Sequence, residues 1–252
     1  MSKKRRIILT AVIVLLAALL AGGLGFVIWA SNPLPAMPEA IAALESDAAV
    51  TITQGDWIAF APTGATPTTG LIFYPGGRVD PRAYAPPLRA LAAAGYYVAL
   101  VPMPLNLAVF GVDRANAVIA ANPQIEQWAL AGHSLGGAMS AAFIDGNPGA
   151  VDGLVFWAAF PAENNDLTDQ PGLAVSSIYG TLDGLATVES VLAGKPLLPP
   201  TAAFVPIDGG NHAQFGSYGD QPGDNPATIT RAEQQAQAVT ATAALLAALA
   251  EQ

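Results

Sequence analysis

Cysteine is missing from this chain, and charged side chains are scarce. The 252 residues include no cysteine, and only 12% are charged. The lack of cysteine excludes disulfide bonds, thiolate metal sites and a cysteine nucleophile. Histidine occurs only twice, as His133 and His212, so a reaction that needs an imidazole base has two candidates. Hydrophobic residues make up 52% of the chain, which is far from the composition of disordered proteins.

Basic residues are few outside the N-terminus. The segment KKRR at positions 3–6 supplies four of the 10 basic side chains, and no acidic residue precedes Ala30. The rest of the chain therefore carries 6 basic and 19 acidic residues, a net charge of −13. Nucleic acid binding requires a basic patch that six scattered cations hardly provide. We therefore expect no nucleic acid partner.

A 24-residue apolar run from Ile7 to Ala30 follows the basic segment. Crossing about 30 Å of hydrocarbon takes about 20 helical residues, whereas the apolar core of a cleavable signal usually has about 7–15. The positive residues keep the N-terminus in the cytoplasm. The sequence thus predicts a cytoplasmic tail over 1–6, a single-pass transmembrane signal anchor over 7–30 and an extracytoplasmic domain. Cleavage and secretion is the second choice.

The remaining sequence predicts a short tether and one domain of class α/β. Three prolines between residues 31 and 48 indicate a stiff tether, and the domain covers 49–252. Apolar runs alternate with alanine-rich helical patterns, which is typical of a mostly parallel sheet with helices on both faces. Eight strands are predicted to begin at positions 50, 57, 71, 97, 128, 153, 174 and 202, the first two as a hairpin. Helices are predicted over 81–94, 112–121, 135–144, 187–192 and 231–250.

The segment GHSLGG at 132–137 joins the strand WALA to an apolar helix. In a G-x-S-x-G turn between strand and helix, the backbone is strained at the serine, and the glycines remove side chains that would collide. The helix N-terminus and the free N–H of Leu135 favour negative charge beside the serine. This context predicts Ser134 as a nucleophile and Leu135 as a backbone donor to an oxyanion.

A serine hydroxyl requires a base, and the base requires an orienting acid. His133 lies on the strained turn with its ring expected to point elsewhere, so its predicted role is packing. His212 follows the last strand and is the predicted base. Asp183 follows the strand at 174–179 and should emerge at the same sheet edge. Asp208 also follows a strand and is the alternative acid.

Further site residues are predicted from position. The turn after the first parallel strand should supply the second oxyanion donor, with Gly77 as first choice and Arg78 as second. Aromatic candidates for the walls of the site are Tyr74, Phe110, Trp157, Phe160 and Phe215. Asp220 and Asp224 lie in a turn without the ligand spacing of a calcium loop, so no metal is predicted there.

From about Val50 to Leu249 the chain resembles an α/β-hydrolase. The resemblance rests on the order Ser134, Asp183, His212, on GHSLGG, and on YGTLDG and GGNHAQFG, which stand where the acid and base motifs of that superfamily stand. More narrowly, the chain is similar to the small serine hydrolases grouped near the dienelactone hydrolases. It differs from dienelactone hydrolases proper, which have cysteine in place of Ser134. It also has Pro75 where lipases and esterases have a histidine before the oxyanion glycines.

These features predict a serine hydrolase that cleaves carboxylic esters of short to medium acyl chain through an acyl-enzyme, without a cofactor. Members of this fold usually carry a lid between the strands that begin here at 153 and 174. Only 14 residues, AFPAENNDLTDQPG, are available for it, so we expect an open site. The alternative is a membrane-tethered binding or scaffolding module with an inactive hydrolase site.

Overall fold

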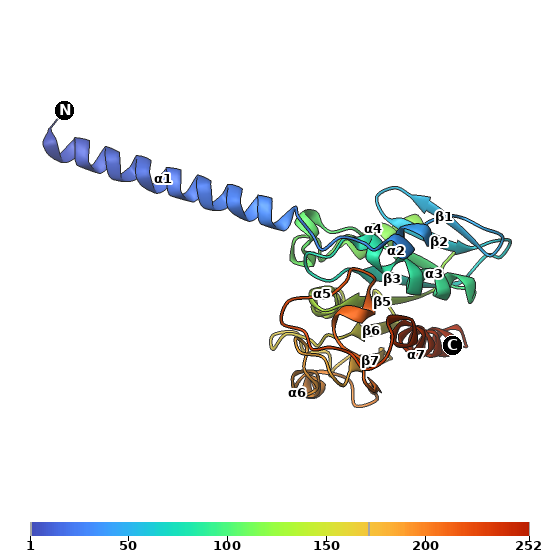
Figure 1. The fold of residues 1–252 in the computed structure, drawn as a ribbon. Coiled ribbons are helices and arrows are strands. Elements are labelled where there is room, and N and C mark those ends of the chain that lie inside the picture. Colours follow the sequence, from blue (N-terminus) through green and yellow to red (C-terminus); the bar gives the residue numbers. More distant parts are fainter. Residues whose placement is uncertain (1, 171, 252) are drawn as a thin grey trace.

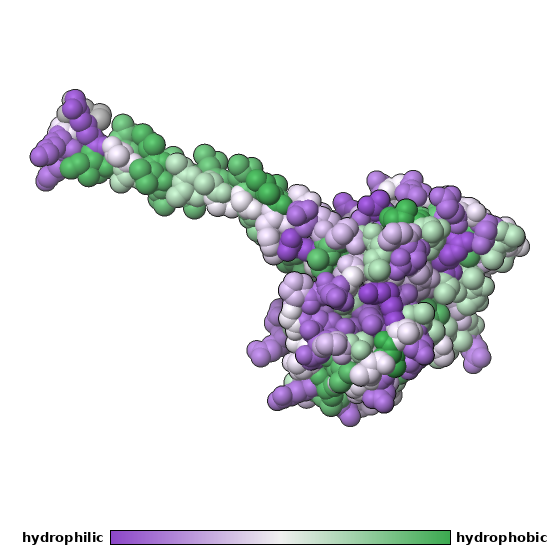
Figure 2. Space-filling view, in the orientation of Figure 1, coloured by the Kyte–Doolittle hydropathy of each residue, from purple (hydrophilic) through white to green (hydrophobic). Residues whose placement is uncertain are grey.

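A long N-terminal helix projects from a layered domain (Figure 1). The computed structural model describes residues 2–170 and 172–251. Helix α1 (Lys3–Ala30) has hydrophobic residues along its length and hydrophilic residues at its free end (Figure 2). Its apolar residues are exposed rather than packed in a core. Among the described residues, α1 is the one helix long and apolar enough to cross a membrane, a property that signal sequences share.

The domain is built on one eight-stranded sheet with the order β1-β2-β4-β3-β5-β6-β7-β8. The strands are β1 (Val50–Gln54), β2 (Ile58–Pro62), β3 (Thr69–Tyr74), β4 (Tyr97–Leu100), β5 (Gln127–His133), β6 (Gly153–Trp157), β7 (Ala174–Gly180) and β8 (Ala203–Ile207). Strands β1 and β2 form an antiparallel hairpin, and β2 also pairs antiparallel with β4. All other pairs are parallel. The predicted strands, hairpin and mostly parallel sheet are confirmed.

Helices cover both faces of the sheet. Side chains of α3 (Ala85–Ala93) and α7 (Arg231–Ala250) pack in the core on one face, and those of α4 (Arg114–Ala121) and α5 (Leu135–Gly146) pack on the other. Shorter helices are α2 (Pro38–Ala42), α6 (Val188–Ala193), η1 (Pro81–Tyr84), η2 (Pro104–Asn106), η3 (Ala108–Phe110), η4 (Lys195–Leu197) and η5 (Ala213–Phe215). The central strands are apolar on both sides because both of their faces are covered.

The segment predicted as a tether packs on the domain instead of separating it from α1. Leu34 forms a parallel bridge with Val79 in the loop after β3. The backbone N–H of Leu34 donates to the carbonyl oxygen of Arg78 at 2.7 Å, and the N–H of Asp80 donates to that of Leu34 at 2.9 Å. These hydrogen bonds fix the exit of α1 beside the loop that carries the predicted oxyanion donors.

Candidate active site

Ser134 lies between β5 and α5 with a backbone φ of 53°. Non-glycine residues rarely adopt this left-handed conformation, and it costs about 1–3 kcal/mol. The turn is possible because Gly132 and Gly136, two residues before and two residues after Ser134, have no side chain. A Cβ on Gly132 would lie 2.3 Å from the carbonyl carbon of Gly136, and one on Gly136 would lie 2.1 Å from the carbonyl oxygen of Tyr74. The local sequence therefore permits the strained turn that was predicted.

Asp183 and His212 are hydrogen-bonded to each other. The Nδ1 atom of His212 lies 2.8 Å from Oδ2 of Asp183, and both residues are buried. The other oxygen, Oδ1, accepts from the backbone N–H groups of Leu185 at 2.8 Å and Ala186 at 2.7 Å. These two donors stabilise the carboxylate as an anion and fix its plane. The carboxylate can then orient the imidazole and favour one tautomer.

Ser134 and His212 line the same cavity, which has a volume of about 410 Å³. The Nε2 atom of His212 is buried and has no hydrogen-bond partner among the described residues. Catalytic hydrogen bonds are often absent or long until a substrate is bound. The structure thus places the predicted nucleophile and base in one cavity without a hydrogen bond between them. Asp208, the alternative acid, instead accepts from the Thr181 hydroxyl at 3.2 Å.

Asp224 joins the loops that carry the acid and the base. Its carboxylate accepts from the backbone N–H groups of Gly184 at 3.1 Å, His212 at 3.2 Å and Ala213 at 2.9 Å. Sequence reasoning interpreted Asp224 only as part of a turn. Its spacing from His212 gave no signal of this bridge, because the acid loop that it also binds is 40 residues away.

One backbone donor in the loop after β3 has no hydrogen-bond partner among the described residues. The N–H of Gly76 donates to the hydroxyl of Tyr84 at 3.0 Å, and the N–H of Arg78 donates to the carbonyl oxygen of Asn106 at 2.7 Å. The N–H of Gly77, between them, has no such partner within the described residues. Gly77 also contacts the residue after the nucleophile, since a Cβ there would lie 3.1 Å from Leu135 Cδ2. Of the two predicted donors, the geometry therefore favours Gly77.

His133 belongs to a buried hydrogen-bond chain. Its Nε2 lies 3.2 Å from the carbonyl oxygen of His212, which can only accept, so Nε2 carries the proton. Its Nδ1 lies 2.8 Å from the hydroxyl of Tyr84. The O–H of Tyr84 has no other acceptor among the described residues, so it donates to Nδ1 while its oxygen accepts from the N–H of Gly76. The chain links the oxyanion loop to the base loop and requires a neutral imidazole.

Burial is the main reason that the pKa of His133 is held well below its ordinary value, and the nearby imidazole of His212 lowers it further. Burial likewise raises the pKa of the Tyr84 hydroxyl. Both groups are therefore uncharged at neutral pH, as the hydrogen-bond chain requires. The pattern suits a structural connection better than a proton acceptor in the reaction.

The predicted wall residues occupy three different environments. Phe160 lines the cavity that contains Ser134. Tyr74, Trp157 and Phe215 are fully buried in the two cores and do not line it. Phe110 is 51% exposed on η3 and lies beside a separate hollow. The cavity is instead completed by small and aliphatic side chains and one amide, from Leu135, Ala138, Ala158, Ala159, Leu185, Ala186 and Gln221.

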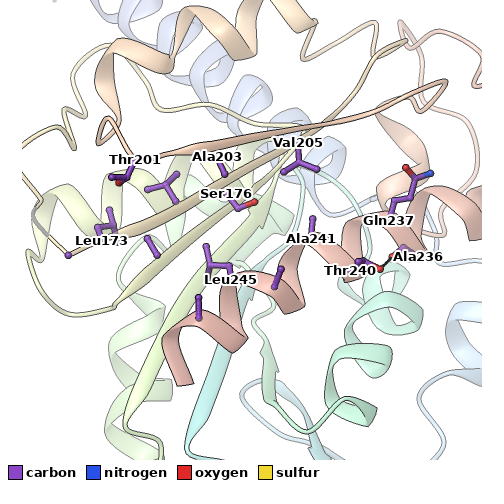
Figure 3. Close-up of a pocket in the computed structure, with 15 residues that line it drawn as sticks. Leu173, Ser176, Thr201, Ala203, Val205, Ala236, Gln237, Thr240, Ala241 and Leu245 are labelled. Atoms are coloured by element: carbon purple, nitrogen blue, oxygen red, sulfur yellow. Dashed lines mark hydrogen bonds between the residues drawn. The ribbon is translucent and has the colours of Figure 1, made fainter. Parts of the chain in front are cut away.

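A larger groove lies away from Ser134, Asp183 and His212, between α7 and strands β7 and β8 (Figure 3). Its volume is about 920 Å³, and its walls are mostly small and apolar, with Ser176, Thr201, Gln237 and Thr240 as the side chains with polar groups. None of the described residues that line it is acidic, basic or charged, so they offer no chemistry comparable to that of the site at Ser134.

A model of the family described as Alpha/beta hydrolase family matches residues 70–236. The match includes Ser134, Asp183 and His212, and it covers the sheet from β3 to β8 but not the hairpin of β1 and β2. A search of curated proteins gave no significant match.

Solved structures with the same fold are distant in sequence. MGS-MChE2, an alpha/beta hydrolase enzyme from a metagenome of sediments of the lagoon of Mar Chica in Morocco, has a TM-score of 0.54 and 17% identity over 66% of this chain and 91% of that chain. Est1E from Butyrivibrio proteoclasticus has a TM-score of 0.54 and 11% identity over 79% and 99%. The esterase domain of a Rhodothermus marinus protein has a TM-score of 0.55 and 14% identity over 78% and 97%. At these identities the likeness supports the fold alone.

Proposed function

Because the chain belongs to the alpha/beta hydrolase family, we propose that it is a serine hydrolase that cleaves carboxylic esters of short to medium acyl chain. The proposal rests mainly on one observation. The Nδ1 atom of His212 is hydrogen-bonded to buried Asp183 at 2.8 Å, while its Nε2 is unpaired in the cavity that Ser134 lines. A base oriented in this way is suited to accept the proton of the serine hydroxyl.

In the proposed mechanism, His212 Nε2 accepts the proton of Ser134 as Oγ attacks the ester carbonyl carbon. The negative charge that develops on the carbonyl oxygen is stabilised by the N–H groups of Leu135 and Gly77. The imidazolium then donates the proton to the leaving alcohol, which leaves an acyl group on Ser134. Water attacks this acyl-enzyme as His212 accepts its proton, and the imidazolium then returns the proton to Ser134 Oγ as the bond to the acyl group breaks and the carboxylic acid leaves. Asp183 stays ionised throughout and keeps the imidazole oriented.

The size and walls of the site support short to medium acyl groups. The cavity of about 410 Å³ has mostly apolar walls, which suits a small alkyl chain. The described residues between β6 and β7 form no helix or strand that could serve as a lid. Nothing in that segment offers the large opening surface that interfacial activation on long-chain lipid requires. The narrower resemblance to the dienelactone hydrolase group remains a prediction.

Labelling and turnover test the proposal together. A fluorophosphonate probe should react at Ser134, and Ser134→Ala should abolish labelling and lower kcat on p-nitrophenyl esters by about 10⁴-fold or more. Rates should be highest for short acyl chains in a series from two to sixteen carbons. Ser140→Ala is a matched control, because this serine is buried and donates only to carbonyl oxygens. Labelling that persists in Ser134→Ala, or a rate that peaks at the longest chains, would contradict the proposal.

We also propose that α1 anchors the enzyme in a membrane with the catalytic domain on the extracytoplasmic side. The basic residues at 3–6 and the apolar helix after them support this topology. Protease added to intact cells or spheroplasts should digest the domain, and the protein should otherwise fractionate with membranes. An untruncated protein that is recovered from the soluble fraction and protected from protease would contradict the anchor.

A further inference from the structure

The end of α1 is bound directly to the oxyanion loop. The guanidinium of Arg78 donates from Nε to the carbonyl oxygen of Trp29 at 3.0 Å and from Nη2 to that of Asn32 at 2.8 Å. It also lies 4.2 Å from the centre of the Trp29 ring. The side-chain amide of Asn106 donates to the carbonyl oxygen of Ala30 at 2.9 Å. Backbone carbonyl groups at and just after the end of α1 thus accept hydrogen bonds from side chains of the domain, which fixes the direction of α1.

The length of α1 indicates where the bilayer ends. Ile7 and Phe26 are the first and last of 20 consecutive residues, which span about 30 Å as a helix, the thickness of the hydrocarbon layer. In the proposed anchor, with Ile7 at the inner boundary of the hydrocarbon, Phe26 lies at its outer boundary and the last four residues of the predicted 7–30 segment lie among the headgroups. Trp29 lies one turn beyond it, in the headgroup region that tryptophan prefers.

Val109 and Phe110 form an exposed apolar tip of the domain, and this tip lies beside Phe26. The ring of Phe110 is 6.2 Å from that of Phe26, in an edge-to-face arrangement. Val109 is 50% exposed and Phe110 is 51% exposed, which is unusual for adjacent large apolar side chains in a soluble domain. Figure 1 shows the green loops that precede α4 beside the end of α1. The exposed neighbours Asp113 and Arg114 carry opposite charges, so no net charge opposes contact with zwitterionic lipid.

We propose that Val109 and Phe110 dock on the outer surface of the bilayer that holds α1. This inference rests on the proposed anchor. Docking at two points, the helix and the tip, turns the carboxyl edge of the parallel strands toward the lipid. Gly77, the proposed oxyanion donor, directly precedes Arg78, whose side chain donates to the carbonyl oxygen of Trp29 in α1. The catalytic cavity thereby faces the membrane surface, where amphiphilic esters accumulate.

Single-cysteine labelling can measure this docking, because the natural chain has no cysteine. The full chain with Val109→Cys is labelled with an environment-sensitive fluorophore and placed in phosphatidylcholine nanodiscs that contain doxyl-labelled lipid. Leu16→Cys, in the middle of α1, is the positive control. Thr66→Cys is the negative control, since it lies in the exposed loop before β3, at the sheet edge opposite Ser134. Hydrolysis of p-nitrophenyl acetate by the same discs tests the proposed function separately.

We expect the label at position 109 to be quenched by lipid as the label at 16 is, while the label at 66 is not. Adding Phe110→Asp should weaken the quenching at 109 and leave that at 16 unchanged. Quenching at 16 without quenching at 109 would overturn the docking but not the anchor. Disulfide cross-linking between unlabelled Val109→Cys residues of two copies, together with no quenching of the label at 109, would also overturn it. Quenching at 109 in discs that hydrolyse no ester would uphold the docking and contradict the proposed function.

Discussion

Replacing His133 tests whether the buried chain beside Ser134 is structural and neutral. His133→Ala removes one hydrogen-bond partner of the Tyr84 hydroxyl and one of the His212 carbonyl oxygen, which still accept from the N–H groups of Gly76 and Phe215. The O–H of Tyr84 is then a buried donor without an acceptor, so the free energy of unfolding should fall by about 1–3 kcal/mol at pH 8. Fluorophosphonate labelling of Ser134 in the folded fraction should persist, because His133 is not the proposed base.

The pH dependence gives this prediction its specific signature. Unfolded His133 binds a proton below pH 6.5, whereas burial holds its folded pKa well below that value. Between these two pKa values the unfolded state binds more protons, so the stability of the natural protein decreases as the pH falls. From pH 8 to pH 5.5 this residue should remove about 1.4 kcal/mol of stability. The Ala variant lacks this loss, so the difference between the two proteins should shrink by that amount.

The measurement is urea unfolding in detergent micelles at pH 8 and pH 5.5, followed by tryptophan fluorescence. Trp157 is a suitable reporter because it is fully buried and bonded to Thr242 at 3.0 Å. Ser140→Ala is the matched control, since it removes a buried hydrogen-bonding side chain that does not titrate. A stability difference between natural protein and His133→Ala that stays constant across this pH range would refute a neutral, buried His133.

Three further variants test other parts of the site. Asp183→Asn should lower kcat by about 10⁴-fold, because an amide favours the wrong tautomer of His212. Arg78→Ala should lower kcat by up to about 10²-fold with little change in KM, since it loosens the loop that holds an oxyanion donor. Gly136→Ala should prevent folding of the domain, because its Cβ would lie 2.1 Å from a backbone carbonyl oxygen, whereas Gly146→Ala, with open space around it, should be tolerated. Steady-state kinetics on p-nitrophenyl esters and yields of folded protein measure these effects.

Different outcomes would locate the error in the reasoning. Full activity in Asp183→Asn would mean that another acid orients the base. A rise in KM without a fall in kcat for Arg78→Ala would assign Arg78 to substrate binding instead of loop positioning. Normal folding of Gly136→Ala would show that the turn can open by more than the contact distances suggest.

Periodicity and turn chemistry were sufficient to predict most of the fold. Strands such as β6 were recognisable as continuous apolar runs, and α7 was predicted over 231–250, where the structure places it behind a capping box of Thr230 and Glu233. Asp183 and His212 could be brought together from the sequence because both follow parallel strands, whose carboxyl ends meet at one edge. These inferences depend on local patterns and on one general rule of topology.

Contacts between loops that are far apart in the sequence have no such pattern of residues to reveal them. Asp224 accepts from Gly184, 40 residues before it in the sequence, and Tyr84 contacts His133 across 49 residues. The wall residues were predicted from aromatic character alone, although the largest of them are buried in the cores by hydrophobicity, not directed into the cavity. The segment 31–48 was interpreted from its prolines as a spacer, since composition does not reveal that Leu34 pairs with Val79.

Backbone strain concentrates at the same edge as the chemistry. In the described residues, the non-glycine residues with positive φ are Arg78, Leu105, Asn106, Ser134 and Ala158, all in turns at the carboxyl ends of parallel strands. Each such conformation costs about 1–3 kcal/mol and persists only where surrounding contacts determine it. For Arg78 and Asn106 these contacts include the carbonyl groups at the end of α1. The last turn of α1 therefore supports the sheet edge that carries the proposed active site. A substitution in that turn should alter the conformation of the loop that contains Gly77 and Arg78.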